Sequence, residues 1–275
     1  MLRVTQCGPI AVFRMGKHIA GNKRWVLYET HSFQLDDTMI DTGTISVEDE
    51  WKSKLNGYRC SAIVNTHHHE DHIGNNRLFQ EKFGVPVFAH PDALSFMENP
   101  ERIRLQLYRK VVWGRPAASH GTPIGNEIST ARHTLQVIHT PGHSQDHICL
   151  YEPMNGLLFS GDIFCGKRLV YLRSDEDFGP TLESLKNLAS LDIKTIFCGL
   201  KGVVENGGGS LKSKIQHMEE LKDKTLELQQ KGLPPHKIRR RLLGYEDGMF
   251  YLSNGHFSKQ NVVNSILGIK RSINP

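Results

Sequence analysis

The sequence predicts an α/β protein that ends in a helical region. Up to about residue 200, short β-favouring runs alternate with segments of helical spacing, and single polar residues follow several of these runs. In the remainder, apolar residues recur three or four positions apart, as on one face of a helix. We therefore expect a core domain over residues 1–206 and a helical extension over residues 207–275 that packs on it.

The composition is that of an ordinary soluble globular protein. Of the 275 residues, 38% are hydrophobic and 23% are charged. There is no run of about 18 apolar residues, and the first residues do not form the apolar core of a signal peptide. We expect a cytoplasmic protein without membrane contact. The five cysteines include no C-x-x-C pair, which argues against a disulfide framework or a structural zinc knuckle.

Turn-forming residues and apolar spacing place the elements along the chain. Gly, Asn and Asp separate the β-favouring runs, and capping residues mark the helix ends. The predicted strands are 10–13, 25–28, 38–40, 61–65, 85–89, 134–139, 148–151, 157–159 and 193–198. The predicted helices are 44–56, one that ends at Gly84, 102–112, one through 182–188, one through 211–228, 235–243, and a last one capped by Ser258.

Three stretches have a distinct character. Residues 91–126 form a proline-punctuated helical insertion, interpreted either as a pocket wall or as a surface segment without substrate contact. Residues 207–210, Gly-Gly-Gly-Ser, are the best candidate for a linker. Residues 201–275 carry 13 Lys and Arg against 7 Asp and Glu, a balance of +6. Their densest cluster, 237–241, has no interleaved aromatic residues and is interpreted as a solvated helix face.

One loop carries the strongest chemical signal. Four histidines and two carboxylates fill its six consecutive positions: His67, His68, His69, Glu70, Asp71 and His72. The loop follows the strand at 61–65, and alternate side chains of an extended chain share a side, so His67, His69 and Asp71 can converge. Imidazoles with carboxylates suit zinc, iron or manganese. The competing interpretation is a solvated polar loop.

Other predicted strands also end in polar residues that can join this loop. Asp41-Thr42-Gly43 follows the strand at 38–40, and Thr140-Pro141-Gly142-His143-Ser144 follows the strand at 134–139. Ser160-Gly161-Asp162 follows the strand at 157–159. Together these residues form one set with the loop: His67, His69, Asp71, His72, His143 and Asp162.

With this set the sequence resembles the metallo-β-lactamase superfamily, whose H-x-H-x-D-H motif has every position filled at residues 67–72. The D-T-G, T-P-G-H-[ST] and S-G-D strand ends of that family are matched in order at residues 41–43, 140–144 and 160–162. The resemblance covers residues 10–200. It implies a four-layer αββα sandwich with the metal loops along one edge of the two sheets.

The resemblance also implies a division of the ligands. It assigns His67, His69 and His143 to one metal, Asp71 and His72 to a second, and Asp162 as the bridge. Zinc is the expected ion, at one or two sites, with iron or manganese as alternatives. A metal-bound hydroxide is the expected nucleophile, and Asp71 is the expected catalytic carboxylate that orients it or moves a proton.

One family feature is missing. Members with two metals present a last histidine in a G-H-G-like turn, and here the turn is Gly199-Leu200-Lys201-Gly202. Leucine cannot bind a metal, so the second site is expected to be short of a ligand. His256 is a candidate replacement ligand, against the plainer interpretation of a surface histidine. Asp41 is expected to fix the metal loop through hydrogen bonds rather than to bind metal.

Three functions from different classes remain open. The leading one is a metal-dependent hydrolase of an ester, thioester, lactone or related small-molecule bond. A mononuclear-iron oxidoreductase of the persulfide dioxygenase type is the second, because the same scaffold can use one metal. A degenerate member that binds a ligand without turnover is the third, motivated by Leu200. We expect a small-molecule substrate and no nucleic-acid partner, and a homodimer formed through the helical tail is an open alternative.

Overall fold

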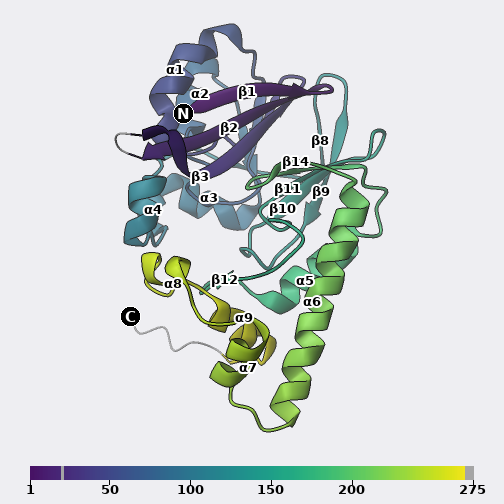
Figure 1. Ribbon diagram of the computed structural model, residues 1–275. Coiled ribbons are helices and arrows are strands. Elements are labelled where there is room, and N and C mark those ends of the chain that lie inside the picture. The colour runs from purple at the N-terminus through teal and green to yellow at the C-terminus, as the bar shows by residue number, and fades with distance from the viewer. Residues whose placement is uncertain (20–21, 270–275) are drawn as a thin grey trace.

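The structure, a computed structural model, describes residues 1–19 and 22–269, with side chains described outside residues 18–27 (Figure 1). It confirms the predicted α/β sandwich: two sheets face each other, and helices cover their outer faces. Within the described residues no helix is long and apolar enough to cross a membrane.

The two large sheets are built from consecutive parts of the chain. Among the described residues, the first has seven strands in sequence order: β1 (Leu2–Cys7), β2 (Ile10–Ile19), β3 (Asn22–Leu35), β4 (Thr38–Ile40), β5 (Ala62–Val64), β6 (Val87–Ala89) and β7 (Thr122–Pro123). The second has the order β14 (Gly202–Glu205), β13 (Thr195–Cys198), β11 (Leu157–Gly161), β10 (Ile148–Glu152), β9 (Thr134–His139) and β8 (Glu127–Ser129). A small ribbon pairs β12 (Leu172–Arg173) with β15 (Phe257–Ser258).

The helices divide between the two outer faces and the C-terminal region. They are α1 (Glu48–Lys54), α2 (Asn76–Phe83), α3 (Pro91–Glu98), α4 (Leu107–Val112), α5 (Phe178–Leu188), α6 (Gly207–Gln230), α7 (Pro235–Leu242), α8 (Gly248–Leu252) and α9 (Lys259–Ile266). Short 3-10 turns occupy Ile45–Val47, Leu55–Gly57 and Pro100–Arg102.

Three apolar layers hold the sandwich together. Between the sheets, side chains such as Phe33 from the first sheet pack against Phe159 and Phe197 from the second. Outside the first sheet, Trp51 of α1 and other helix residues cover strand residues. Outside the second sheet, α5 and α6 supply residues such as Leu211. Burial of such large apolar side chains stabilises each layer by about 1.5–3 kcal/mol per residue.

The sheet topology gathers several strand ends at one edge. β4 pairs with β5 and β11 with β13 in parallel, so the loops that follow these strands leave from the same ends. The loops after β4 and β5 are also joined directly, because Gly74 N donates to Gly43 O at 2.7 Å. A Cβ at Gly74 would collide with that oxygen, so only glycine permits this approach.

The linker prediction for residues 207–210 is wrong. This stretch forms the first turn of α6, and the Asn206 side chain caps it by accepting a hydrogen bond from Gly209 N. A Cβ at Gly207 would come within 2.7 Å of Ile193 and within 3.0 Å of Ile196 in β13, so glycine lets the helix start against this strand. The sequence suggested flexibility, but here glycine serves close packing.

Other differences concern element lengths. The first strands are longer than predicted, because β2 and β3 continue as one antiparallel hairpin beyond the apolar runs. The predicted helix 102–112 is a 3-10 turn and the shorter α4. The strands β1, β7, β8, β12, β14 and β15 and the helix α8 were not predicted. The predicted N-cap of the last helix is confirmed, since the Ser258 side chain accepts from Gln260 N at 2.9 Å.

Candidate metal centre

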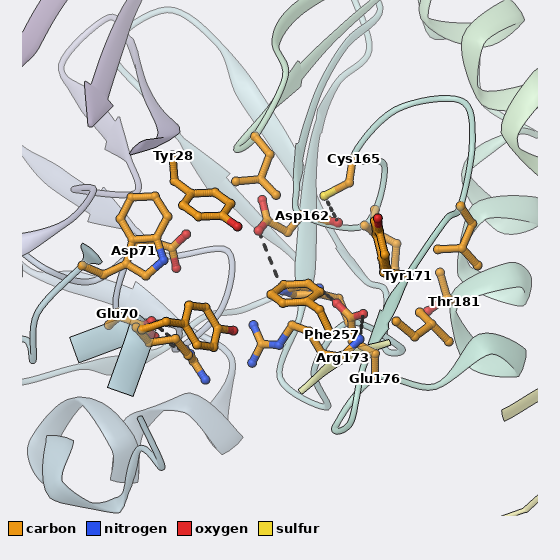
Figure 2. A pocket seen from close by; sticks show the side chains of 18 of the residues that line it. Tyr28, Glu70, Asp71, Asp162, Cys165, Tyr171, Arg173, Glu176, Thr181 and Phe257 are labelled. Atoms are coloured by element: carbon orange, nitrogen blue, oxygen red, sulfur yellow. Dashed lines mark hydrogen bonds and ion pairs between the residues drawn. The ribbon is translucent and has the colours of Figure 1, made fainter. Parts of the chain in front are cut away.

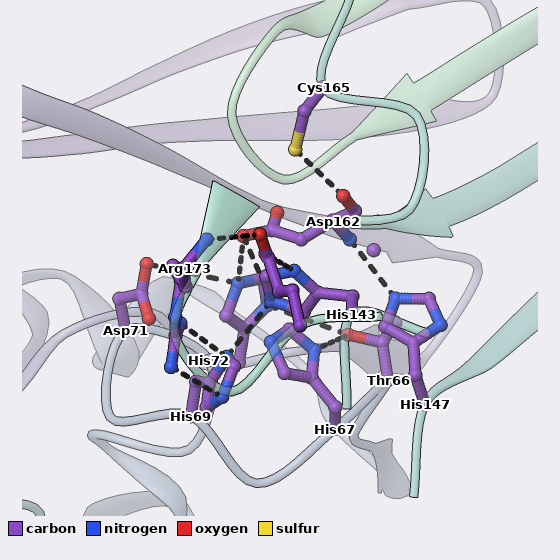
Figure 3. A network of polar contacts seen from close by, with 12 residues as sticks. Thr66, His67, His69, Asp71, His72, His143, His147, Asp162, Cys165 and Arg173 are labelled. Carbon is purple, nitrogen blue, oxygen red and sulfur yellow. Dashed lines mark hydrogen bonds and ion pairs between the residues drawn. The ribbon is translucent and has the colours of Figure 1, made fainter. Parts of the chain in front are cut away.

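The loop after β5 places two of its histidines in a buried cluster with His143 from the loop after β9. His67, His69 and His143 form a group whose donor atoms all lie within 4.8 Å of one another (Figure 3). His69 Nδ1 and His143 Nε2 are 3.0 Å apart. Two nitrogens of a tetrahedral zinc site are roughly 3.4 Å apart, given Zn–N bonds of about 2.0–2.1 Å. The three imidazoles therefore have nearly the spacing that one ion requires.

Neighbouring groups orient these imidazoles. Thr66 Oγ1 lies 3.0 Å from His67 Nδ1, which leaves Nε2 of that ring facing the cluster. Glu176 Oε1 lies 2.5 Å from His143 Nδ1 and so directs Nε2 of His143 towards His69. Burial, with the nearby imidazoles, lowers the pKa of His67 well below its ordinary value. A neutral imidazole with a free lone pair is the form that binds metal.

A second donor group adjoins the first. His67, His72 and Asp162 have donor atoms within 4.8 Å of one another, and His72 Nε2 lies 3.5 Å from Asp162 Oδ2. Asp71 Oδ2 is 3.9 Å from the same His72 nitrogen. Burial alone would lower the pKa of His72, but the carboxylates of Asp41, Asp162 and Asp71 raise it well above its ordinary value. The surroundings of Nε2 therefore favour a positive charge.

Asp41 ties the two loops behind this group. Its Oδ1 accepts from Thr66 N at 2.8 Å, and its Oδ2 accepts from Thr66 Oγ1 at 2.8 Å and lies 2.7 Å from His72 Nδ1. Asp41 itself has a φ of 58°, in the left-handed region. The Asp41 carboxylate thus fixes the His72 ring with Nε2 directed at Asp71 and Asp162. Asp41 itself is not a member of either donor group.

Three buried polar atoms in the centre have no hydrogen-bond partner among the described residues. They are His67 Nε2, His72 Nε2 and Asp162 Oδ1. Leaving such an atom unpaired costs about 1–3 kcal/mol, more when the group is charged. These three residues form one of the donor groups, so a single ion bound between them would satisfy the buried atoms together. The residues present fit a divalent metal.

The turn after β13 approaches the second donor group without adding a ligand. A Cβ at Gly199 would collide with Asp162 Oδ1, so the backbone packs directly against that carboxylate. Leu200, next in the chain, lines the pocket over the metal centre. Its side chain has no donor atom, so this turn adds no ligand to the second group of His67, His72 and Asp162 or to the adjacent Asp71.

His256 does not join the metal donors. It lies outside both donor groups found among the described residues, with Nδ1 2.8 Å from Ser174 Oγ and Nε2 3.8 Å from Asp175 Oδ1. The interpretation of His256 as a surface histidine is wrong, because the residue is only 4% exposed. Burial, followed by the charge of Arg173, lowers its pKa to about 4.

Sequence reasoning missed three residues that contact the ligands: Glu176, described above, Arg173 and His147. Arg173 places two guanidinium nitrogens 3.1 and 3.2 Å from the two ring nitrogens of His69, and it pairs with Asp175 at 2.9 Å. His147 Nε2 accepts from Asp162 N at 3.1 Å and so fixes the backbone of that ligand. His147 follows the predicted Thr140–Ser144 motif by three residues, which was an available signal, whereas Arg173 lies in a segment with little regular structure.

A pocket opens over the metal centre, and Asp71, His143 and Asp162 lie in its lining (Figure 2). Much of its wall is aromatic, and the aromatic residues come from distant parts of the chain: Tyr28, Tyr108, Trp113, Tyr171 and Phe257. Tyr108 and Trp113 belong to the insertion at 91–126, so the interpretation of that segment as a pocket wall is confirmed. The pocket therefore lies directly against one donor from each group, His143 and Asp162.

Comparison with known proteins places this centre in a family. Residues 19–200 match the family model described as the metallo-beta-lactamase superfamily. The chain is 31% identical over 147 residues to a hydroxyacylglutathione hydrolase of Maricaulis maris, a match that covers 52% of this chain and 48% of that protein. It is 25% identical over 238 residues to the beta-lactamase-like protein 2 homolog of Drosophila melanogaster, covering 82% of this chain and 73% of that protein. The match to the first relative thus spans about half of its length.

Solved structures share the fold at low sequence identity. A beta-lactamase domain protein from Burkholderia ambifaria superposes with a TM-score of 0.69 at 16% identity, covering 97% of this chain and 88% of that one. A metallo-beta-lactamase family protein from Thermus thermophilus gives a TM-score of 0.65 at 19% identity, covering 94% and 93%. Both matches extend over nearly the whole chain, so the fold likeness includes most of the C-terminal helices.

Proposed function

The chain belongs to the metallo-beta-lactamase superfamily, and from this premise we propose that it is a metal-dependent hydrolase of an ester, thioester, lactone or related small-molecule bond. The observation that supports this most directly is the buried set of unpaired donors, His67 Nε2, His72 Nε2 and Asp162 Oδ1, of which Asp162 also lines the aromatic pocket. The likeness to a hydroxyacylglutathione hydrolase supports a thioester as one substrate class to test.

The proposed ligands follow the two donor groups. His67, His69 and His143 would hold one ion, and Asp71 and His72 would hold a second that shares Asp162. A divalent ion such as zinc supplies acidity, since it lowers the pKa of a bound water to about 7. Iron and manganese suit the same nitrogen and oxygen donors.

The chain's own groups would then handle substrate and protons. Asp71 lines the pocket, and its carboxylate would orient the nucleophile or move a proton. The aromatic wall from α4, β3 and the C-terminal region would bind the apolar part of the substrate and exclude water around the scissile bond.

Metal content and turnover test the proposal together. Protein purified without a histidine tag is analysed for metals and assayed against a panel of esters, thioesters and lactones. We expect zinc or manganese and hydrolysis of at least one class. A protein that holds no metal and turns over none of the panel, while still binding a metabolite, would establish the degenerate binding member instead.

One observation favours a second candidate, a mononuclear-iron oxidoreductase. The group His67, His72 and Asp162 contains two histidines and one carboxylate, the donor set of many non-haem iron oxygenases. Leu200 beside it leaves the second ion without a further ligand. One iron per chain, with oxygen consumption on a persulfide and no ester turnover, would favour this candidate over the hydrolase.

Leu200→His is predicted to raise the metal-to-protein ratio. The new imidazole would stand in the turn that already packs against Asp162, and it would supply the ligand that the second donor group lacks. Elemental analysis of the wild type and Leu200→His, with Leu200→Gln as a variant of similar size that lacks an imidazole, measures the effect. An unchanged ratio in Leu200→His would show that another group already completes the second site.

A further inference from the structure

We propose that Lys214, on α6, binds an anionic group of the substrate, so that the molecule hydrolysed carries a carboxylate or a similar anion. This inference rests on the proposed hydrolase function and adds the chemical class of its substrate. It also gives the C-terminal helical region a direct role in recognition, because α6 begins after the last strand of the second sheet.

Lys214 is buried in the wall of the same pocket that contains the metal donors. The residue is 2% exposed and lines the pocket together with Asp162 and Thr181. Its Nζ donates one long hydrogen bond, 3.3 Å, to Gly166 O, and it lies 6.0 Å from the centre of the Phe164 ring. An ammonium group has three donors, so most of its hydrogen-bonding capacity is unused.

Other cations of this pocket are already neutralised by the protein. Arg173 pairs with Asp175 at 2.9 Å, and Arg109 forms a two-pronged ion pair with Glu70. Within the part of the chain that the structure describes, Lys214 has no carboxylate within ion-pairing distance. Of the described Lys and Arg residues that line the pocket, Lys214 is therefore the one that is free to pair with an anionic ligand.

Burial makes this arrangement costly without a ligand. A charged group removed from water is destabilising unless an opposite charge compensates it, and burial lowers the pKa of Lys214.

Two thiols, Cys165 and Cys198, lie close to Lys214. Cys165 donates to Asp162 O at 2.7 Å, so it is a neutral thiol. Burial would raise the pKa of Cys198, but hydrogen bonds to its sulfur, among them those from the backbone of Leu200 and Lys201, lower that pKa to about 7. A Cys198 thiolate is thus the competing counter-ion.

The pocket extends from the metal donors towards the helices of the second sheet. In Figure 2, Asp162 lies between Asp71 and Tyr28 on one side and Tyr171 and Thr181 on the other. Thr181 belongs to α5, which packs on α6. A substrate with its scissile bond at the metal donors can therefore place a second group against the wall formed by α5 and α6, where Lys214 would bind an anion.

A matched pair of esters tests the inference. The 4-nitrophenyl ester of glutaric acid ends in a free carboxylate, and its terminal methyl ester is neutral. In Lys214→Met we expect kcat/KM for the acid to fall about 10- to 100-fold, the scale of one lost hydrogen bond to a charged group, while kcat/KM for the neutral ester is unchanged. Lys212→Met, an exposed lysine on the same helix, should leave both values unchanged.

The outcomes separate this inference from the proposed function. An equal loss on both esters, or no loss on either, would overturn the role of Lys214 while leaving the hydrolase intact. If the metal-loaded wild type hydrolyses neither ester, the proposed function fails for this class, and thermal shift tests Lys214 alone. Glutarate should then raise the Tm of the wild type and not of Lys214→Met, and equal shifts would refute the inference.

Unliganded stability tests the competing counter-ion. Replacing an unpaired buried cation by methionine should leave the Tm unchanged or raise it at both pH 6 and pH 8. A Tm that falls in Lys214→Met at pH 8 but not at pH 6 would show that a Cys198 thiolate pairs with Lys214, and the anion site would be refuted.

Discussion

Replacing His143 by alanine is expected to remove most bound metal and nearly all activity. His143 Nε2 lies 3.0 Å from His69 Nδ1, and the same residue contacts Glu176 through Nδ1, so the ring contributes both a ligand and its orientation. Loss of groups that merely orient ligands already costs about 10- to 100-fold in metal affinity or activity, so loss of the ligand itself should exceed that range. Elemental analysis and kcat/KM on the best substrate measure the two effects.

His67→Ala should give the same result, because His67 belongs to both donor groups. His236→Ala is the matched control, since His236 is an exposed histidine on α7 and should change neither metal content nor activity. Retention of metal by either His67→Ala or His143→Ala would refute the three-histidine assignment. The unfolding midpoint of each variant shows whether a loss of activity reflects misfolding instead.

The sequence was sufficient to predict the donors because they are local to strand ends. Parallel pairing of β4 with β5 and of β11 with β13 places the loops that follow them at the same end within each sheet. The packing of the two sheets face to face then brings Asp162 to the histidine loop. The fold class and the family could also be predicted, because the four motifs at strand ends occur in the order that is typical of the family.

The groups around the donors were not predictable in the same way. Arg173 and Glu176 come from a segment whose strand, β12, has two residues and pairs with the distant β15. Their positions depend on how α9 packs on α5 and on β12. Contacts between such distant parts of the chain leave no short motif in the sequence. Lys214 appeared as one charge among many in a basic tail, and only the three-dimensional structure shows that it is buried in the pocket.

Arg109→Met is expected to destabilise the fold strongly. Glu70, inside the histidine loop, is 0% exposed, and Arg109 of α4 donates to both of its carboxylate oxygens, through Nε at 2.7 Å and through Nη2. Removal of the guanidinium would leave a buried carboxylate unpaired beside Asp71. Breaking a buried ion pair in this way costs about 3–5 kcal/mol, to be measured as the loss in the free energy of unfolding by urea titration.

Two further variants separate the buried pair from a general effect of losing an arginine. Arg77→Met breaks the exposed pair with Glu81, whose side chains are 58% and 61% exposed, and it should cost less than about 1 kcal/mol. The double variant Arg109→Met with Glu70→Leu removes both buried charges and should recover much of the lost stability. If Arg109→Met is no more destabilising than Arg77→Met, the pair does not anchor α4 to the metal loop, and the pocket wall must be held by its aromatic contacts, such as that between Tyr28 and Trp113.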